Sequence, residues 1–233
     1  MQKDVIDQIR AEQQFFSTLQ QFNHASEDKQ INHLIFQAST AAQRIPQFNQ
    51  WPDNPKQFWN AESIVWRGRI EQDVRNGIMG ELSFLGTKDN VNVDLGAGSA
   101  CYVPHSVAVD FSDEMLHLNI AAKKIHANLE EPLPLSDNMC HSASLIFVVN
   151  YIKNVQQLLS EAHRILQDNG TLAIVQSSTG VHNLHKMHYK NSHSEAELRL
   201  LMQYAGFTVD SYTKNIAGKE LLFLIGQKAI NGF

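Results

Sequence analysis

The spacing of hydrophobic positions divides this 233-residue chain into two parts with different patterns. In the first part, apolar residues recur at three- and four-residue steps, as at Ile31, Leu34 and Ala38, which is the period of an amphipathic helix. From Val91 onward, short apolar runs alternate with helical stretches, a pattern typical of a parallel sheet with crossover helices. We therefore predict an N-terminal helical cap over residues 1–60 and an α/β domain over residues 61–233.

The α/β part has enough apolar runs for a sheet of seven strands. Only a few residues around Ala217 and Gly218 join the last two runs, too few for a crossover helix, so these strands should form an antiparallel hairpin. The pattern thus predicts a three-layer α/β sandwich with a mostly parallel, seven-stranded sheet and an antiparallel last strand. The strands are expected at 91–95, 107–110, 124–127, 142–147, 171–176, 207–213 and 220–227, with helices at 113–121, 154–167 and 194–205. Before the sheet, one helix is expected from about Ala61 to Leu85, strained or interrupted near Gly77 and Gly80.

Charge and composition exclude several classes of partner. The net charge of -5 argues against a broad contact with a phosphate backbone, so we expect no nucleic-acid substrate. The apolar run from Leu145 to Val149 is too short to span a bilayer, and the charged start does not resemble a signal peptide. Cys101 and Cys140 are most simply reduced thiols. We expect a cytoplasmic protein that does not bind membranes.

A glycine-bracketed turn after the first predicted strand is the most informative local feature. Asp94 is followed by Gly96 and Gly98, and the second predicted strand ends at Asp110. Glycines allow the backbone to approach a bound molecule closely, because a Cβ atom would stand in the way. A carboxylate at the end of the next strand can accept both hydroxyl groups of a ribose. These residues together predict a site for a nucleoside cofactor at the edge of a parallel sheet.

The order of the motifs along the chain carries a family resemblance over about residues 60–230. The motifs are Val93-Asp94-Leu95-Gly96-Ala97-Gly98, then Val109-Asp110-Phe111-Ser112-Asp113-Glu114-Met115-Leu116, then Leu133-Pro134-Leu135-Ser136-Asp137-Asn138 and Glu161-Ala162-His163-Arg164-Ile165-Leu166. This sequence resembles the class I S-adenosylmethionine-dependent methyltransferases. It is most similar to their small-molecule subgroup (methyltransferase type 11), which includes the ubiquinone and menaquinone methylases. The resemblance implies the Rossmann-like methyltransferase sandwich and S-adenosyl-L-methionine as cofactor.

The resemblance also implies roles for the residues of the glycine turn. Asp94 would face the amino group of the methionine moiety, directly or through water, and Asp110 would hold the ribose hydroxyls. Gly96, Ala97 and Gly98 would place their backbone against the methionine and the ribose.

Further cofactor contacts are implied around the adenine ring. Phe111 and Met115 would lie beside the ring, and Leu129 would offer it a backbone N–H. Asn128 stands where the family often has an aspartate that contacts the adenine amino group. The floor of the pocket would be closed by Ile146 and Phe147.

The chain departs from the family pattern just after the glycine turn. Only eight residues separate Gly98 from Val107, so the helix after the first strand must be short, one or two turns ending before Pro104. A nicotinamide-binding turn would have glycine three places after Gly98, where this chain has Cys101.

Candidates for a catalytic base are weaker than the cofactor residues. His182, His185, His188 and His193 follow the fifth predicted strand, and Tyr151 follows the fourth. Three-residue steps between the first three histidines would suit a metal site, but no carboxylate or cysteine lies among them, so we predict no metal. They would instead line the substrate entrance or form a solvated polar loop. His182, His185 and Tyr151 remain candidates for a base that removes a proton from the acceptor.

We therefore predict a methyltransferase that moves a methyl group from S-adenosylmethionine to a small molecule, acting as a monomer or homodimer. Two alternatives stay open. One is a catalytically silent regulatory protein that binds S-adenosylmethionine, and the other is a nucleotide-dependent oxidoreductase.

Overall fold

The computed structural model describes residues 2–25, 27–86, 90–177 and 183–229. They divide into two compact units by their contacts. Met1–Ile70 together with His182–Met187 is called here the helical unit, and Glu71–Val181 together with His188–Phe233 is called the sheet unit. The expected division at residue 60 stays a prediction, and a single helix runs through that position.

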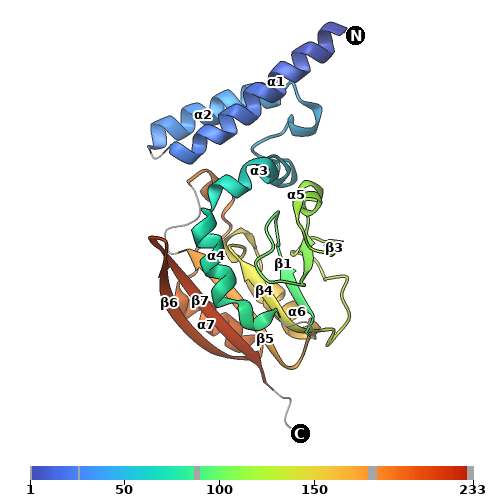
Figure 1. The fold of residues 1–233 in the computed structure, drawn as a ribbon, viewed down its shortest axis with the longest axis vertical. Helices are drawn as coiled ribbons and strands as arrows, with labels where there is room; N and C mark the ends of the chain where they lie inside the picture. Colours follow the sequence, from blue (N-terminus) through green and yellow to red (C-terminus); the bar gives the residue numbers. More distant parts are fainter. Residues whose placement is uncertain (1, 26, 87–89, 178–182, 230–233) are drawn as a thin grey trace. The chain divides into compact units, whose positions relative to one another are not determined.

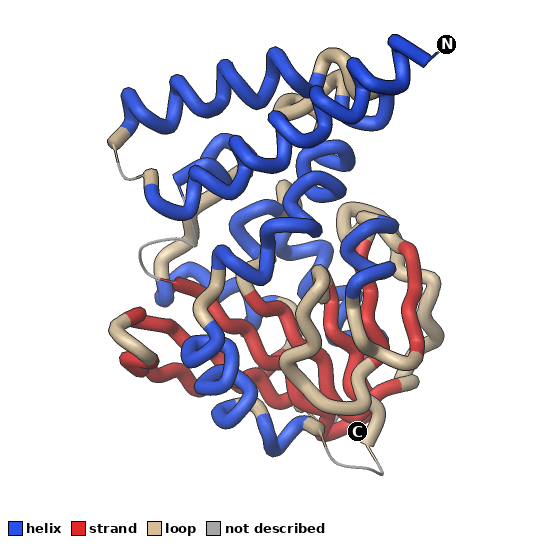
Figure 2. Tube along the Cα trace, turned by 45° about the horizontal axis from the view of Figure 1, so that its top comes forward, coloured by secondary structure: helices blue, strands red, loops and turns tan. Residues whose placement is uncertain are grey.

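The helical unit consists of helices joined by loops (Figure 2). Helix α1 (Gln2–Gln21) packs against α2 (Asp28–Ala42), with the short 3-10 turn η1 (Phe22–His24) between them. After a second 3-10 turn, η2 (Pro46–Phe48), helix α3 (Pro55–Arg69) begins behind Asn54, whose side chain caps it by accepting from the Gln57 N–H. Proline is tolerated at the first helical position, because its missing N–H would have no partner there in any case.

Aromatic side chains fill the centre of the helical unit. Phe15 lies edge-on to Trp51 at 5.3 Å between ring centroids, and Trp51 stacks on Phe58 at 6.4 Å. All three rings are buried. Residues of α1, α2 and α3 contribute to this core. Val5 and Ile9, near the start of α1, lie outside it and are about half exposed.

The sheet unit contains one seven-stranded sheet in the order β3-β2-β1-β4-β5-β7-β6 (Figure 1). Its strands are β1 (Asn92–Leu95), β2 (Val107–Asp110), β3 (Lys123–His126), β4 (Cys140–Ile146), β5 (Leu166–Ser177), β6 (Phe207–Ile216) and β7 (Lys219–Lys228). β7 lies antiparallel between β5 and β6, and the other pairings are parallel. The predicted fold class and the reversed last strand are therefore confirmed.

Helices cover both faces of this sheet. α6 (Val155–Ile165) and α7 (Glu195–Tyr204) contact each other and share one apolar core with the strands. In Figure 1, α4 (Gln72–Glu81) passes in front of the sheet while α6 and α7 lie behind it. The shorter α5 (Asp113–Leu118) packs on β2 and β3. The three layers expected from the alternating pattern are thus present.

The prediction of one helix from Ala61 to Leu85 with a break at its glycines was wrong. α3 ends at Arg69 and α4 begins at Gln72, so the break falls at Ile70 and Glu71. Gly77 lies inside α4, where a Cβ atom would stand 2.2 Å from Cγ2 of Ile216 on β6. The glycine therefore allows α4 to approach the sheet closely and does not interrupt the helix.

The short helix expected after the first strand was also wrong. Residues 96–106 form turns and irregular backbone with no helix, and Val107 then starts β2. A buried hydrogen bond from Ser106 Oγ to the Val103 carbonyl, 2.6 Å long, stabilises this connection. With so few residues available, side-chain bonds replace the helix that would otherwise order the segment.

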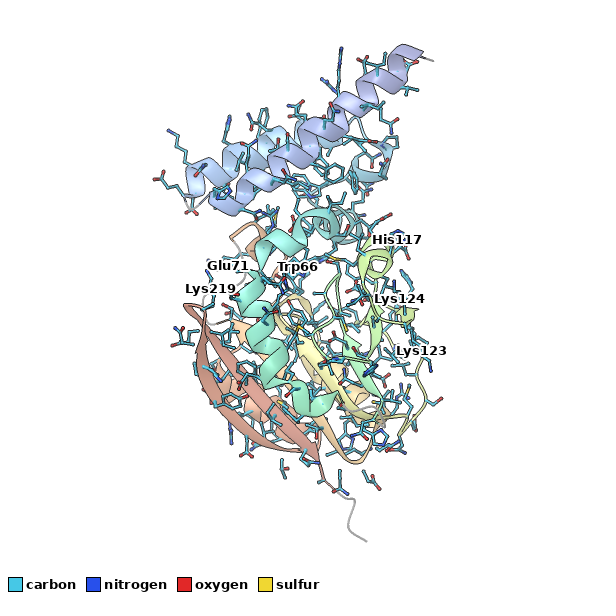
Figure 3. The ribbon with its side chains drawn as sticks, in the orientation of Figure 1. Trp66, Glu71, His117, Lys123, Lys124 and Lys219 are labelled. Carbon is cyan, nitrogen blue, oxygen red and sulfur yellow. The ribbon has the colours of Figure 1, made fainter. Side chains whose placement is uncertain are left out.

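Polar side chains connect and protect parts of the sheet unit outside its apolar core. Arg164 at the end of α6 donates to the carbonyls of Leu133 and Leu135. These hydrogen bonds join the sequence motif that begins at Leu133 to the motif that contains Arg164. On the edge strand β3, Lys123 and Lys124 are exposed, and Nζ of Lys124 donates to the His117 carbonyl at 3.4 Å (Figure 3 labels all three residues). Exposed lysines on an edge strand discourage pairing with another chain.

Candidate functional site

The glycine turn after β1 is fixed to β2 by its backbone. The Val109 carbonyl accepts from the N–H groups of both Gly96, at 2.8 Å, and Ala97, at 3.0 Å. Gly96 and Gly98 have φ angles of 74° and 56°, in the left-handed region that glycine adopts without a steric penalty. The Asn119 amide at the end of α5 donates to the Gly98 carbonyl at 2.8 Å. These bonds hold the turn rigidly above the carboxyl ends of β1 and β2.

Asp110 closes β2 and bonds to the backbone on two sides. Its Oδ2 accepts from the Gly98 N–H at 2.9 Å, and its Oδ1 accepts from the Ser112 N–H at the same distance. Burial raises the pKa of this carboxyl, while the backbone bonds oppose that effect. Each oxygen of a carboxylate keeps further accepting capacity, so these two bonds leave room for ligand hydroxyls.

Asp94 lies in the middle of the sheet and is 2% exposed. Ser144 on the neighbouring strand β4 donates its hydroxyl to Oδ1 of Asp94 at 2.8 Å. Burial and the nearby charge of Asp110 together raise the pKa of Asp94 to about 7, although the bond from Ser144 opposes the rise. Two buried carboxyl groups thus flank one turn.

The residues expected around an adenine ring lie in different environments. Met115 is buried on α5, Leu129 is buried after β3, and Phe111 is half-buried. The Asn128 side chain is exposed and bonds within its own turn, accepting from the Glu130 N–H and donating to Glu131. A ligand contact through that amide would therefore require these local bonds to break.

The carboxyl end of β4 forms the other wall of the site. Ile146 and Phe147 are buried there, and Phe147 has a φ of 60°, an unusual value for a bulky residue. Next in sequence, Val148 lies under the glycine turn, because a Cβ on Gly96 would come within 2.6 Å of its Cγ2. Strained backbone of this kind gathers at functional sites.

Two buried hydroxyl groups beside the turn were missed by the sequence analysis. The Ser99 and Tyr102 hydroxyls have no hydrogen-bond partner among the residues that the structure describes, and both residues are at least 96% buried. The charge of Asp94 raises the pKa of Tyr102 further, after burial itself. A buried polar atom without a partner is unfavourable, so these hydroxyls are suited to a ligand. Ser99 directly follows Gly98 in the chain, but no motif marks the hydroxyl of either residue, and only the fold determines that both are buried without a partner.

Tyr151 follows β4 in the 3-10 turn η4 (Val149–Tyr151). Its ring packs edge-on against Tyr189 at 5.1 Å, and the neighbouring Asn191 amide donates to the carbonyls of Val149 and Ile152. The segment before α7 therefore positions Tyr151 beside the end of β4.

His185 belongs to the helical unit, whereas the glycine turn belongs to the sheet unit. It lies in the 3-10 helix η5 (Asn183–His188), is completely buried, and has its Nε2 2.8 Å from Oε2 of Glu62. The rings of Phe58, Trp59 and Trp66 surround it at 5.4 to 5.7 Å. His182 falls outside the described residues.

Neither a metal cluster nor a membrane helix is found in the described parts of the chain. Within 2–25, 27–86, 90–177 and 183–229, no three histidine, cysteine, aspartate or glutamate side chains gather closely enough to hold a metal ion. In the same ranges, no helix combines the length and apolar character needed to cross a bilayer.

Comparisons with known proteins agree with this geometry. Residues 93–174 match the family model of a methyltransferase domain. No curated protein sequence matches the chain significantly.

Several solved structures share the fold at low sequence identity. The methyltransferase from a complex with the Haloferax volcanii Trm112 methyltransferase activator is 16% identical, with a TM-score of 0.60 over 74% of this chain and 98% of that one. A methyltransferase from Aquifex aeolicus is 15% identical, with a TM-score of 0.57 over 73% and 98% of the two chains. A Thermotoga maritima structure, titled a possible histamine N-methyltransferase, is 20% identical, with a TM-score of 0.57 over 72% and 94%.

The matched segment begins at Val93, one residue before Asp94, and ends at Ile174 in β5, so it contains the glycine turn with Asp94, Asp110 and Ser144. Residues 93–174 are therefore similar to a methyltransferase domain, and the fold of the chain is that of the class I S-adenosylmethionine-dependent methyltransferases.

Proposed function

We propose that this protein transfers the methyl group of S-adenosyl-L-methionine to a small-molecule acceptor. The observation that carries the proposal is the pair of buried carboxyl groups, Asp94 and Asp110, on either side of the Gly96–Gly98 turn. One acid at the end of each neighbouring strand suits a ligand with an ammonium group at one end and a ribose near its middle.

The residues around the turn fit such a cofactor in order. Asp94 would accept from the ammonium group, and Asp110 would accept from the ribose hydroxyls. The unpartnered hydroxyls of Ser99 and Tyr102 would find partners on the polar methionine end. The backbone of Gly96, Ala97 and Gly98 would pack against the ligand, with Phe111, Met115 and Leu129 beside the adenine and Ile146 and Phe147 below it.

The cofactor supplies a sulfonium that already activates the methyl group, so the protein's task is chiefly alignment and exclusion of water. A small acceptor with a free lone pair then needs no catalytic base. For an acceptor that must lose a proton, Tyr151 is the described candidate within the sheet unit, since its hydroxyl is buried beside the end of β4.

Calorimetry with S-adenosylhomocysteine tests the cofactor assignment. We expect micromolar binding by the wild type and a loss of roughly ten- to a hundredfold in Asp110→Asn, because hydrogen bonds to a charged group contribute about 1.5–3 kcal/mol. The matched control is Asp210→Asn, an exposed carboxylate on β6, which should bind like the wild type. If a folded Asp110→Asn variant bound S-adenosylhomocysteine as tightly as the wild type, Asp110 would not hold the ribose hydroxyls.

Two further measurements separate the alternatives. A nucleotide-dependent oxidoreductase would bind a nicotinamide dinucleotide and ignore S-adenosylhomocysteine, so the same calorimeter run with both ligands distinguishes it. A silent regulatory protein would bind the cofactor but release no S-adenosylhomocysteine from S-adenosylmethionine when supplied with hydroxyl, amine and thiol acceptors. Turnover with any of these acceptors supports the enzyme.

A further inference from the structure

The two carboxyl groups at the glycine turn differ in their bonding, although both are buried. Asp110 accepts from two backbone N–H groups, those of Gly98 and Ser112, at 2.9 Å each. Asp94 accepts from one hydroxyl, that of Ser144, at 2.8 Å. Backbone N–H groups stabilise a carboxylate strongly, so Asp110 is the better place for a negative charge.

The surroundings of Asp94 offer it little positive charge. The charge of Asp110 from β2 acts on Asp94, and Asp94 in turn raises the pKa values of Cys101 and Tyr102 in the segment between the strands. Arg75 of α4 acts on Tyr102 and His126 of β3 acts on Asp110, but neither is among the groups that shift the pKa of Asp94. Two like charges in one buried site repel each other, so the pair retains a proton more readily than either acid alone.

We propose that Asp94 carries a proton in the empty protein and exchanges it for the ammonium group of the bound cofactor. The proton leaves the Asp94 carboxyl group for the solvent, the ammonium N–H then donates to the carboxylate, and the Ser144 hydroxyl remains a donor throughout. The inference rests on the proposed function, because it concerns the same cofactor at the same turn.

The exchange predicts how cofactor affinity depends on pH. Burial, together with the charge of Asp110, raises the pKa of Asp94 to about 7. Below pH 7 the empty site holds the proton, so binding must displace it, and affinity falls by roughly tenfold for each pH unit. Above pH 7 the carboxylate is already charged, and affinity levels off.

Isothermal titration with S-adenosylhomocysteine in buffers of different ionisation enthalpy counts the released protons. At pH 6 we expect close to one proton released per ligand bound, and at pH 8 close to none. Asp94→Asn should bind more weakly, release no proton and show affinity independent of pH. Ser144→Ala should move the midpoint of the pH profile upward, because it removes the donor that favours the charged acid.

The controls assign the proton to its residue. His126→Gln should leave the proton count unchanged; a count that disappears with His126 would overturn the assignment to Asp94. Equal proton release by the wild type and Asp94→Asn would also overturn the assignment to Asp94. Tight binding at pH 6 without release of a proton would overturn it as well. Those outcomes leave the proposed function standing, whereas absence of binding at every pH contradicts the proposed function itself.

Discussion

Nε2 of His185 lies 2.8 Å from Oε2 of Glu62, although 123 residues separate them in the sequence. Glu62 also accepts from Arg69, through Nε at 3.0 Å and Nη2 at 2.8 Å. All three side chains are inaccessible to solvent. Burial disfavours the charged form of Glu62, but His185 and Arg69 outweigh that effect and lower its pKa to about 2. The network ties the η5 segment to α3 within the helical unit.

Replacement of Glu62 by glutamine should destabilise the protein strongly. The change leaves Arg69 buried without a negative partner, and breaking a buried ion pair from one side typically costs about 3–5 kcal/mol. Urea unfolding followed by tryptophan fluorescence measures the loss. As a control, Asp7→Asn breaks the exposed pair with Arg10, and exposed pairs contribute only about 0–1 kcal/mol. An effect of Glu62→Gln as small as that of the control would contradict the role of the network.

The same carboxylate should contribute to acid sensitivity. Its pKa falls from the ordinary 4.5 in the unfolded chain to about 2 in the folded one. The stabilisation is therefore complete above pH 4.5 and is lost as the pH falls through 2. Melting temperatures of the wild type and Glu62→Gln, measured from pH 6 to pH 2.5, should converge toward the acid end. A constant difference between the two proteins across this range would show that Glu62 is not the titrating group.

Two glycines in α4 should respond oppositely to alanine. At Gly77 a Cβ would stand 2.2 Å from Cγ2 of Ile216, whereas at Gly80 nothing lies within 4 Å. Gly80→Ala should stabilise by about 0.5–1 kcal/mol through helix propensity, and Gly77→Ala should destabilise by about 1–3 kcal/mol through overpacking. Thermal unfolding compares them, and adding Ile216→Ala to Gly77→Ala should recover part of the loss. Stabilisation by both alanines would refute the close packing of α4 on β6.

Gly96 and Gly218 form a second matched pair. Both have positive φ angles, 74° and 81°, but a Cβ meets Val148 at 2.6 Å in the first case and open space in the second. Gly218→Ala should show backbone strain alone, about 1 kcal/mol, with binding of S-adenosylhomocysteine unchanged. Gly96→Ala should lose more stability, because the strain and the steric overlap add, and it should also weaken binding. Thermal shift with and without the ligand measures both effects, and equal behaviour of the two variants would argue against a special role for Gly96.

Much of the fold could be predicted from local patterns. Strand β2 was predicted at its observed bounds, and the short link at Ala217 and Gly218 predicted the antiparallel hairpin correctly. Both succeed because side-chain period and loop length are properties of neighbouring residues. The glycine turn between Asp94 and Asp110 could be found in the same way, since acid, glycines and strand ends follow one another along the chain.

Other features of the structure could not be read from the local sequence pattern. Gly77 suggested a helix break because its local propensity is poor, but its contact with Ile216 keeps it inside α4. The adenine contact of Asn128 stays a prediction, and the pattern did not indicate that its amide bonds within its own turn. His185 looked like a candidate base in a polar loop, and the structure buries it against Glu62.

The sequence by itself determined the class of fold, the order of its strands along the chain and the position of the turn with its two acids. Only the tertiary structure decided that Ser144 and Asn119 hold this turn, that Ser99 and Tyr102 present buried hydroxyls beside it, and that His185 packs with the helical unit. Periodicity and turn chemistry act between neighbours in the chain. Hydrogen-bond partners and packing contacts depend on which distant segments the completed fold brings together, and no local pattern records them.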